Sequence, residues 1–182
     1  PNWTLGSEWA YGKPRGIDND YGNGDPSLGY TGSKVIGYNL SGGYGYVASP
    51  SYAQTPAIDC SNYTDVRLNY WYWLGVEGSQ WDHAAVEVSN NGSSWTTLWS
   101  NPASPLSGGS WRQARFALSA TADGEATVYV RWKMGTTDSS YHYAGWNLDD
   151  IRISGLHVTP GLDRDGDLIS DIWELTYFGS TN

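Results

Sequence analysis

The sequence has a single cysteine, Cys60, among its 182 residues, so no disulfide can form within the chain. Proteins without disulfides are most often cytosolic. That inference is weak for this chain, because many exported bacterial domains also lack disulfides and use calcium as a cross-link. We expect Cys60 to be a small buried apolar residue rather than a reactive thiol.

Long apolar runs and basic residues are also scarce. No segment has the roughly 20 consecutive apolar residues that a membrane-spanning helix needs. The chain has 10 Lys and Arg against 19 Asp and Glu, which gives a net charge of −9. Nucleic acid and anionic membrane surfaces are therefore poor partners, since both require clustered basic residues. The chain begins with Pro rather than Met, and we expect it to be a module of a larger secreted or cell-surface protein.

Phenylalanine is rare as well, although aromatic residues are not. Only 2 Phe stand beside 11 Trp and 14 Tyr, and there are 23 Gly. Trp and Tyr combine a large apolar body with a polar tip, so they suit the edges of a core and wet binding surfaces alike. The many glycines break helices and form turns. Together these features predict an all-β fold.

The clearest strand is predicted at residues 65–76. Its alternating pattern divides the side chains between two faces. One face is mainly apolar and carries Val66, Leu68, Tyr70, Tyr72 and Leu74. The other face is amphipathic and carries Arg67, Asn69, Trp71 and Trp73. The first face is typical of a core, and the second of a surface where rings and polar groups lie side by side.

Further strands are expected at 3–5, within 34–49, and at 83–89, 94–99, 111–118, 126–134 and 146–154. An Asn91-Gly92 pair lies between two of them, as in a tight hairpin. Short strands joined by Gly, Asn and Asp turns predict an antiparallel two-sheet sandwich of the jelly-roll type. We expect this sandwich to span residues 1–157. Residues 158–182 are expected to form a linker, a calcium loop and a short helix.

An acidic loop follows the predicted sandwich. Calcium binds six to eight oxygens, and in an EF-hand loop these come from positions 1, 3, 5, 7, 9 and 12. In this sequence those positions are Asp163, Asp165, Asp167, Ile169 (through its carbonyl), Asp171 and Glu174. Five carboxylates at this spacing predict a Ca²⁺ site. The alternative is a solvated acidic linker.

This segment resembles the calcium loops of thrombospondin type 3 repeats and dockerins, with two departures. Position 6, where the chain turns sharply and Gly is usual, holds Leu168. The residues at 158–162 contain Pro160 and Gly161 and cannot form an entering helix. We therefore expect a single loop with only an exiting helix, in which Gly166 takes the turn or the affinity is reduced.

Two blocks of the sandwich resemble jelly-roll domains of the MAM and cleaved-adhesin families. One is Gly145–Ile153 (GWNLDDIRI), and the other is Glu77–Trp95 with its Asn-Gly turn. The resemblance covers about residues 30–154. It implies a lectin-like sandwich with one calcium ion held by loop carboxylates. Candidate ligands are Asp18, Asp20, Asp25, Asp82, Asp149 and Asp150. Adjacent carboxylates in a strand point to opposite faces unless a bulge intervenes, so one of Asp149 and Asp150 is expected to cap a loop instead.

No catalytic motif is present. Glu77, Asp82 and Glu87 are spaced by five residues, unlike the Glu-x-Asp-x-x-Glu pattern of sandwich glycosidases. The histidines share no metal-ligand spacing, and no Gly-x-Ser-x-Gly or Cys–His signature occurs. We therefore expect a non-catalytic protein.

Two functions follow, and the sequence leaves both open. The first is a carbohydrate-binding module, in which rings stack on the C–H faces of sugars and polar groups bind their hydroxyls. The candidate side chains are Tyr44, Tyr46, Arg67, Asn69, Trp71, Trp73, Tyr141, His142 and Tyr143. The second is a structural or protein-interaction domain attached to a secreted protease or adhesin. The resemblance to cleaved adhesins favours the second function, and the richness in Trp and Tyr favours the first.

Overall fold

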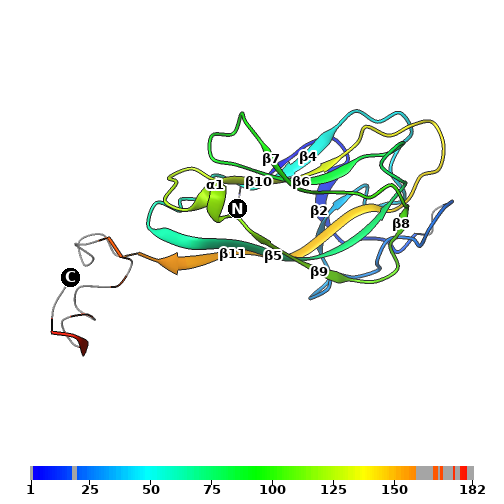
Figure 1. Cartoon of the computed structure of the whole chain (residues 1–182). Helices are drawn as coiled ribbons and strands as arrows, with labels where there is room; N and C mark the ends of the chain where they lie inside the picture. The colour runs from blue at the N-terminus through cyan, green and yellow to red at the C-terminus, as the bar shows by residue number, and fades with distance from the viewer. Residues whose placement is uncertain are drawn as a thin grey trace.

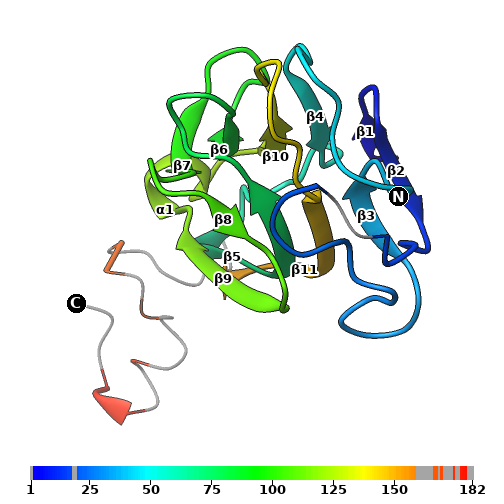
Figure 2. The same ribbon diagram turned by 90° about the vertical axis from the view of Figure 1, so that its right-hand side faces the viewer.

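The computed structural model describes residues 2–17 and 20–158, together with 166, 167, 169, 174 and 177–179. Two antiparallel sheets face each other (Figures 1 and 2). The first has the order β1 (Thr4–Leu5), β4 (Ser51–Gln54), β10 (Tyr129–Met134), β6 (Ala84–Ser89) and β7 (Thr96–Ser100).

The second sheet is built around two long strands. Its order is β2 (Trp9–Gly12), β3 (Val35–Tyr38), β11 (Gly145–His157), β5 (Tyr63–Val76) and β8 (Leu106–Ser107), and β9 (Arg112–Ala117) also pairs with β5. A single helical turn, α1 (Ser119–Ala122), follows β9. The predicted all-β sandwich is confirmed. Among the described residues, no helix is long and apolar enough to cross a membrane.

The core lies between the sheets and is rich in aromatic rings. Trp132 of β10 and Trp146 of β11 are at most 1% exposed, and the ring of Tyr70 meets Trp132 edge to face at 5.1 Å. The predicted inward face of β5 is confirmed, because Val66, Leu68, Tyr70 and Leu74 are all buried. Cys60 is 3% exposed, and burial raises the pKa of its thiol, as expected for a structural residue.

Several boundaries differ from the prediction. Strands β2, β4 and β8 were not predicted, because each has at most four residues and takes its register from a neighbouring strand. The strand expected at 126–134 begins only at Tyr129, since Val128 forms an isolated bridge with Ile58. Strand β11 continues past Ser154 to His157, because its last residues pair with the start of β5.

Candidate functional site

The outer face of the second sheet combines aromatic and polar side chains. Cross-strand partners share a face of a sheet, so the register of β5 with its neighbours shows which residues join Asn69 and Trp71. Gln113 and Arg115 of β9 lie opposite Trp71 and Asn69, respectively, and Arg152 of β11 lies opposite Asn69 on the other side. The amphipathic face of β5 is therefore extended by polar groups from both adjacent strands.

Four rings contact one another in succession at this face, and we call them the aromatic row: Trp73, Trp111, Tyr30 and Trp71. The ring centroids of Trp73 and Trp111 are 6.2 Å apart, and those of Trp111 and Tyr30 are 6.4 Å apart. Tyr30 stacks on Trp71 at 3.7 Å with an interplanar angle of 10°. Tyr30 is 43% exposed. Trp71 and Trp73 were predicted at this surface, whereas Tyr30 and Trp111 were not.

The loop that carries Tyr30 is held in place by the acidic pair of β11. Asp149 Oδ2 accepts a hydrogen bond from the Thr31 backbone N–H at 3.0 Å, and Asp150 Oδ1 accepts one from the Thr31 hydroxyl at 2.7 Å. A bulge in β11 between Asp149 and Arg152 allows both adjacent carboxylates to reach the same residue. Asp149 thus has the loop-capping role expected for one member of the pair.

Two hollows lie beside the aromatic row. The first has a volume of about 440 Å³ and is lined by Asn69, Trp71, Gln113, Asp150, Arg152 and Ser154. The second, of about 360 Å³, includes Trp73 and Trp111 among its lining residues. The first hollow therefore places one ring among five polar side chains, whose groups both donate and accept hydrogen bonds.

The other predicted aromatic platform is at the loop end of the sandwich. Tyr46 is 50% exposed and stacks on His142 at 4.7 Å, and Tyr141 is 45% exposed. His142 Nε2 lies 2.8 Å from Asp20 Oδ2. Tyr44 and Tyr143 were also expected to contact ligand, but they are 1% and 8% exposed, so their rings are not available for stacking.

An acidic cluster lies at the same end, which is at the right of Figure 1 and faces the viewer in Figure 2. Glu77 and Asp82 belong to the β5–β6 connection, and Asp138 belongs to the β10–β11 connection. One carboxylate oxygen from each lies within 4.8 Å of the others. Asp82 was a predicted metal ligand. Glu77 and Asp138 were not, because only the fold brings these two connections together.

Buried hydrogen bonds fix the cluster. The Tyr44 hydroxyl donates to Asp82 Oδ2 and accepts from the Glu77 backbone N–H at 3.1 Å. Asp82 Oδ1 accepts the Asp138 backbone N–H at 2.8 Å. The Asn101 amide donates to the carbonyls of Glu77 and Asp82, both at 2.9 Å. Tyr44 is thus a structural member of the cluster rather than a surface ring.

The surroundings disfavour negative charge on these carboxylates. Burial raises the pKa of Glu77, and the charges of Asp82 and Asp138 raise it further. Burial also raises the pKa of Asp82, although hydrogen bonds from Tyr44 and the Asp138 N–H act in the opposite direction. A cation or a proton at this position would relieve the repulsion.

The remaining carboxylates proposed for the sandwich do not come together in the described part of the chain. Asp25 is 6% exposed, and its Oδ1 accepts a hydrogen bond from Asn147 Nδ2 at 2.7 Å. Burial raises the pKa of Asp25 to about 7. Asp20 pairs with His142, and Asp149 and Asp150 bind Thr31. Asp18 lies outside the described residues.

Only part of the predicted C-terminal calcium loop is described. Asp163, Asp165 and Asp171 lie outside the described residues, so their role as ligands stays a prediction. Gly166 has a φ of 77°, the left-handed conformation for which glycine is suited. Asp167 Oδ1 accepts the Ile169 backbone N–H at 2.8 Å.

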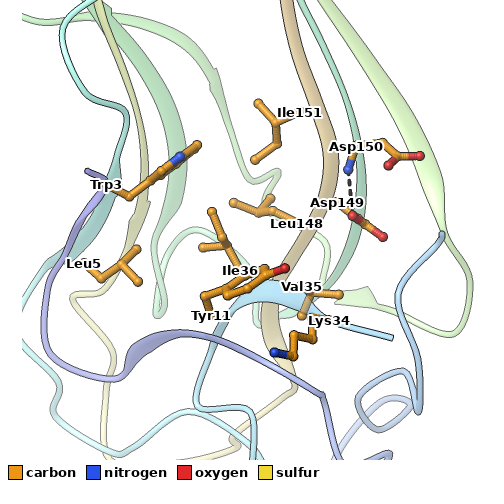
Figure 3. Close-up of a pocket in the computed structure, with 10 residues that line it drawn as sticks. All are labelled: Trp3, Leu5, Tyr11, Lys34, Val35, Ile36, Leu148, Asp149, Asp150 and Ile151. Atoms are coloured by element: carbon orange, nitrogen blue, oxygen red, sulfur yellow. Dashed lines mark hydrogen bonds between the residues drawn. The ribbon is translucent and has the colours of Figure 1, made fainter. Parts of the chain in front are cut away.

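A third hollow of a different kind opens between the sheets (Figure 3). Its volume is about 480 Å³, and its apolar lining includes Trp3, Leu5, Ile36 and Ile151. In Figure 3 the carboxylates of Asp149 and Asp150 point away from these side chains. The lining of this inter-sheet hollow is therefore mainly apolar, although Lys34 and Tyr11 also line it and carry polar groups.

Comparison with known proteins supports the architecture. No family model and no curated protein matches the chain. Among solved structures, SGBP-B from a xyloglucan utilization locus of Bacteroides uniformis has a TM-score of 0.50 at 13% identity, covering 85% of this chain and 47% of that one.

Two other solved structures are similar over nearly their whole lengths. The K3 cleaved adhesin domain of Lys-gingipain from Porphyromonas gingivalis w83 has a TM-score of 0.47 at 18% identity, covering 82% of this chain and 93% of its own. The CBM22-1 xylan-binding domain of Paenibacillus barcinonensis Xyn10C has a TM-score of 0.49 at 12% identity, covering 87% and 88%. The solved structures similar to this chain thus include a cleaved adhesin domain and a xylan-binding module.

Proposed function

We propose that this chain is a non-catalytic carbohydrate-binding module that takes sugar on the outer face of its second sheet. One observation carries the proposal: Tyr30 stacks on Trp71 directly beside a hollow lined by polar side chains. The C–H faces of a sugar ring pack against such aromatic surfaces, and its hydroxyls bind amide and guanidinium groups. Asn69, Gln113 and Arg152 supply those groups here.

The same hollow supports a binding role rather than hydrolysis. Glycoside hydrolysis generally uses two carboxyl groups on either side of the scissile bond. Asp150 is the one carboxylate among the residues that line the hollow, and its Oδ1 is hydrogen-bonded to Thr31. Among the described residues that line this hollow there is one carboxyl group rather than a pair, which supports sugar binding over sugar cleavage.

Calcium and an extracellular location belong to the same proposal. The acidic spacing from Asp163 to Glu174 matches an EF-hand-like loop, and calcium would stabilise a chain that has no disulfide. We propose that the module is secreted or displayed at the cell surface as part of a larger protein.

The alternative function is a structural or protein-interaction domain of a secreted protease or adhesin. The observation that favours it is the inter-sheet hollow of Figure 3, whose lining is mainly apolar and suits a side chain of a neighbouring domain. In this case the outer face would bind no sugar.

Binding of the full chain to an array of soluble plant, algal and bacterial polysaccharides, with calcium present, separates the two functions. We expect selective binding that is lost in Trp71→Ala. Trp81→Ala is the matched control, because Trp81 is 53% exposed and lies outside the aromatic row. Equal binding by both variants, or no binding to any polysaccharide, would contradict the carbohydrate proposal.

A further inference from the structure

We infer that the sugar held on the outer face of the second sheet carries a negative charge, which Arg115 and Arg152 bind from the two sides of Asn69. The inference rests on the proposed function and deepens it, because it names the chemical class of sugar that the same face takes. A neutral sugar would use the rings and amides of this face and leave both cationic groups without a counter-charge.

The register of three strands places the two arginines. Asn69 of β5 pairs with Arg115 of β9 on one side and with Arg152 of β11 on the other. Paired residues share a face of the sheet, and adjacent strands are about 4.8 Å apart, so the two arginine backbones are separated by about 10 Å. Two long side chains at this separation can both reach one small anion that lies over the residue between them.

Neither arginine is neutralised by a carboxylate. In the part of the chain that the structure describes, the arginines that form ion pairs are Arg67 and Arg131. Arg152 is exposed and lines the hollow of about 440 Å³. Arg115 is also exposed and donates to the Gln113 side-chain oxygen at 2.8 Å, which leaves most of its five N–H donors available to a ligand.

The overall charge makes these two positions informative. With 10 basic against 19 acidic residues, the chain has more than enough carboxylates to pair every arginine. Arg67 and Arg131 are paired in this way, with Asp65 and Glu87. Two cations that stay unpaired on one face repel each other, and a bound anion would relieve that repulsion.

The surroundings of the hollow also differ from one end to the other. Asp149 of β11 pairs with Trp71, and Asp150 follows it at the bulge, whereas Arg152 pairs with Asn69. These two levels are about 7 Å apart along the strand. A sugar ring stacked on Trp71 would therefore direct its charged substituent toward the arginines and its uncharged hydroxyls toward Asp150.

The chemistry of the guanidinium group selects the anion. Its planar set of N–H donors matches the paired oxygens of a carboxylate, and it binds groups such as phosphate and sulfate in a similar way. Sugars carry such oxygens as uronic acids or as sulfate esters. The ligand chemistry is therefore an acidic sugar, and the experiment below separates the two sources of its charge.

The test is calorimetric titration of the full chain with pairs of oligosaccharides that differ only in charge. One pair is an oligogalacturonate and its methyl ester, and the other is a sulfated galactan oligosaccharide and its desulfated form. We expect the charged member of one pair to bind about tenfold more tightly than its neutral partner, as two exposed ion pairs would allow. The pair that shows this difference identifies the anionic group.

Single and double variants assign the preference to the two arginines. Arg115→Gln and Arg152→Gln should each weaken binding of the charged sugar about threefold, and the double variant should bind charged and neutral sugars nearly equally. Lys133→Gln is the matched control, because it removes the same charge from β10 of the other sheet, where Lys133 follows the inward-facing Trp132. It should leave both affinities unchanged.

Salt and calcium give further readouts. At about 1 M salt the Debye length is about 3 Å, so the preference for the charged sugar should shrink in the parent chain and change little in the double variant. Each titration is run with calcium and with EDTA, since calcium can join two carboxylates. A preference that occurs only with calcium would overturn the inference.

Two other results would also overturn it. One is equal affinity for the charged and neutral members of both pairs, which would leave the carbohydrate proposal standing if Trp71→Ala still abolishes binding. The other is an equal loss in Arg152→Gln and Lys133→Gln, which would show that only the net charge matters. Failure of every sugar to bind would instead contradict the proposed function itself, and this inference with it.

Discussion

The two faces of strand β5 carry similar residues and have different roles. Tyr70 points inward, is 2% exposed and packs against Trp132. Trp71, the next residue, points outward and is covered on one side by Tyr30, which comes from a loop rather than from the opposite sheet. Aromatic content alone therefore does not mark a binding surface. The surroundings of each ring decide whether it stabilises the fold or is available to a ligand.

The outward rings are held by specific polar contacts. Trp73 Nε1 donates to the Gly24 carbonyl at 3.0 Å, and Asp149 and Asp150 bind Thr31 beside Tyr30. These contacts position the loop at residues 24–31 over the face. An ordered outer face of this kind loses little side-chain entropy when a ligand binds.

The largest expected effect comes from the inner face. Trp132→Ala should lower the free energy of unfolding by about 3–5 kcal/mol, because it leaves a large cavity between the sheets. Trp71→Ala should cost much less, since one side of its ring faces a hollow. Urea unfolding of both variants checks this difference. Similar losses would mean that the two faces are equally part of the core.

A buried carboxyl group beneath the aromatic row, that of Asp25, gives the next effect. Folding raises the pKa of Asp25 from 3.8 to about 7. At a pH between these two values, Asp25 is therefore protonated in the folded state and ionised in the unfolded state. The contribution of Asp25 to the free energy of unfolding is greatest below about pH 4 and falls as the pH rises to about 7. The free energy of unfolding can fall by at most about 4 kcal/mol over this range, at about 1.4 kcal/mol per pH unit.

The matched variant for this effect is Asp25→Asn, which keeps an acceptor for Asn147 Nδ2. Urea unfolding at a series of pH values should show a flatter profile between pH 4 and 7 for Asp25→Asn than for the parent chain. Parallel profiles would exclude Asp25 as the source.

The outer face is tested through ligand affinity. Trp71→Ala should weaken binding of the preferred oligosaccharide by about 2 kcal/mol, or about 30-fold in Kd, as is typical for an aromatic residue at the centre of an interface. Calorimetric titration measures the change. Far-UV circular dichroism confirms that the variant is folded, and unchanged affinity would remove the ring from the site.

The smallest effect comes from the loop that carries Tyr30. A Cβ added at Gly29 would lie 2.6 Å from Asp149 Oδ2 and 2.5 Å from the Thr31 carbonyl. Gly29→Ala should therefore displace Tyr30 from Trp71 and weaken sugar binding severalfold, with a loss of about 1 kcal/mol in stability. Gly45→Ala is the control, because nothing lies within 4 Å of its added Cβ. Equal behaviour of the two variants would show that the position of Tyr30 does not matter.

Local patterns in the sequence predicted local features of the structure. The alternation of β5 separated Tyr70 from Trp71 correctly, and the Asn91-Gly92 turn lies between β6 and β7. Period-two patterns carry this information because successive side chains in a strand face opposite sides. Strands β2, β4 and β8 were missed because such short segments show no clear period and are defined by their pairing with neighbouring strands.

Long-range features could not be predicted in the same way. Glu77 and Asp138 are far apart in the sequence, and they meet because β5, β6, β10 and β11 end or begin at the same end of the sandwich. Tyr30 lies in an irregular polar loop, and only the contacts of Thr31 with β11 place its ring over Trp71. The composition predicted aromatic surfaces, but the topology determines which rings they contain.

The most direct test of the central claim is NMR of the tryptophan indole N–H groups during titration with the oligosaccharide that the array selects. The account predicts that the resonances of Trp71, Trp73 and Trp111 shift in proportion to saturation, while those of the buried Trp132 and Trp146 stay fixed. Shifts confined to Trp3, beside the inter-sheet hollow, or binding that leaves Trp71, Trp73 and Trp111 unchanged, would contradict it.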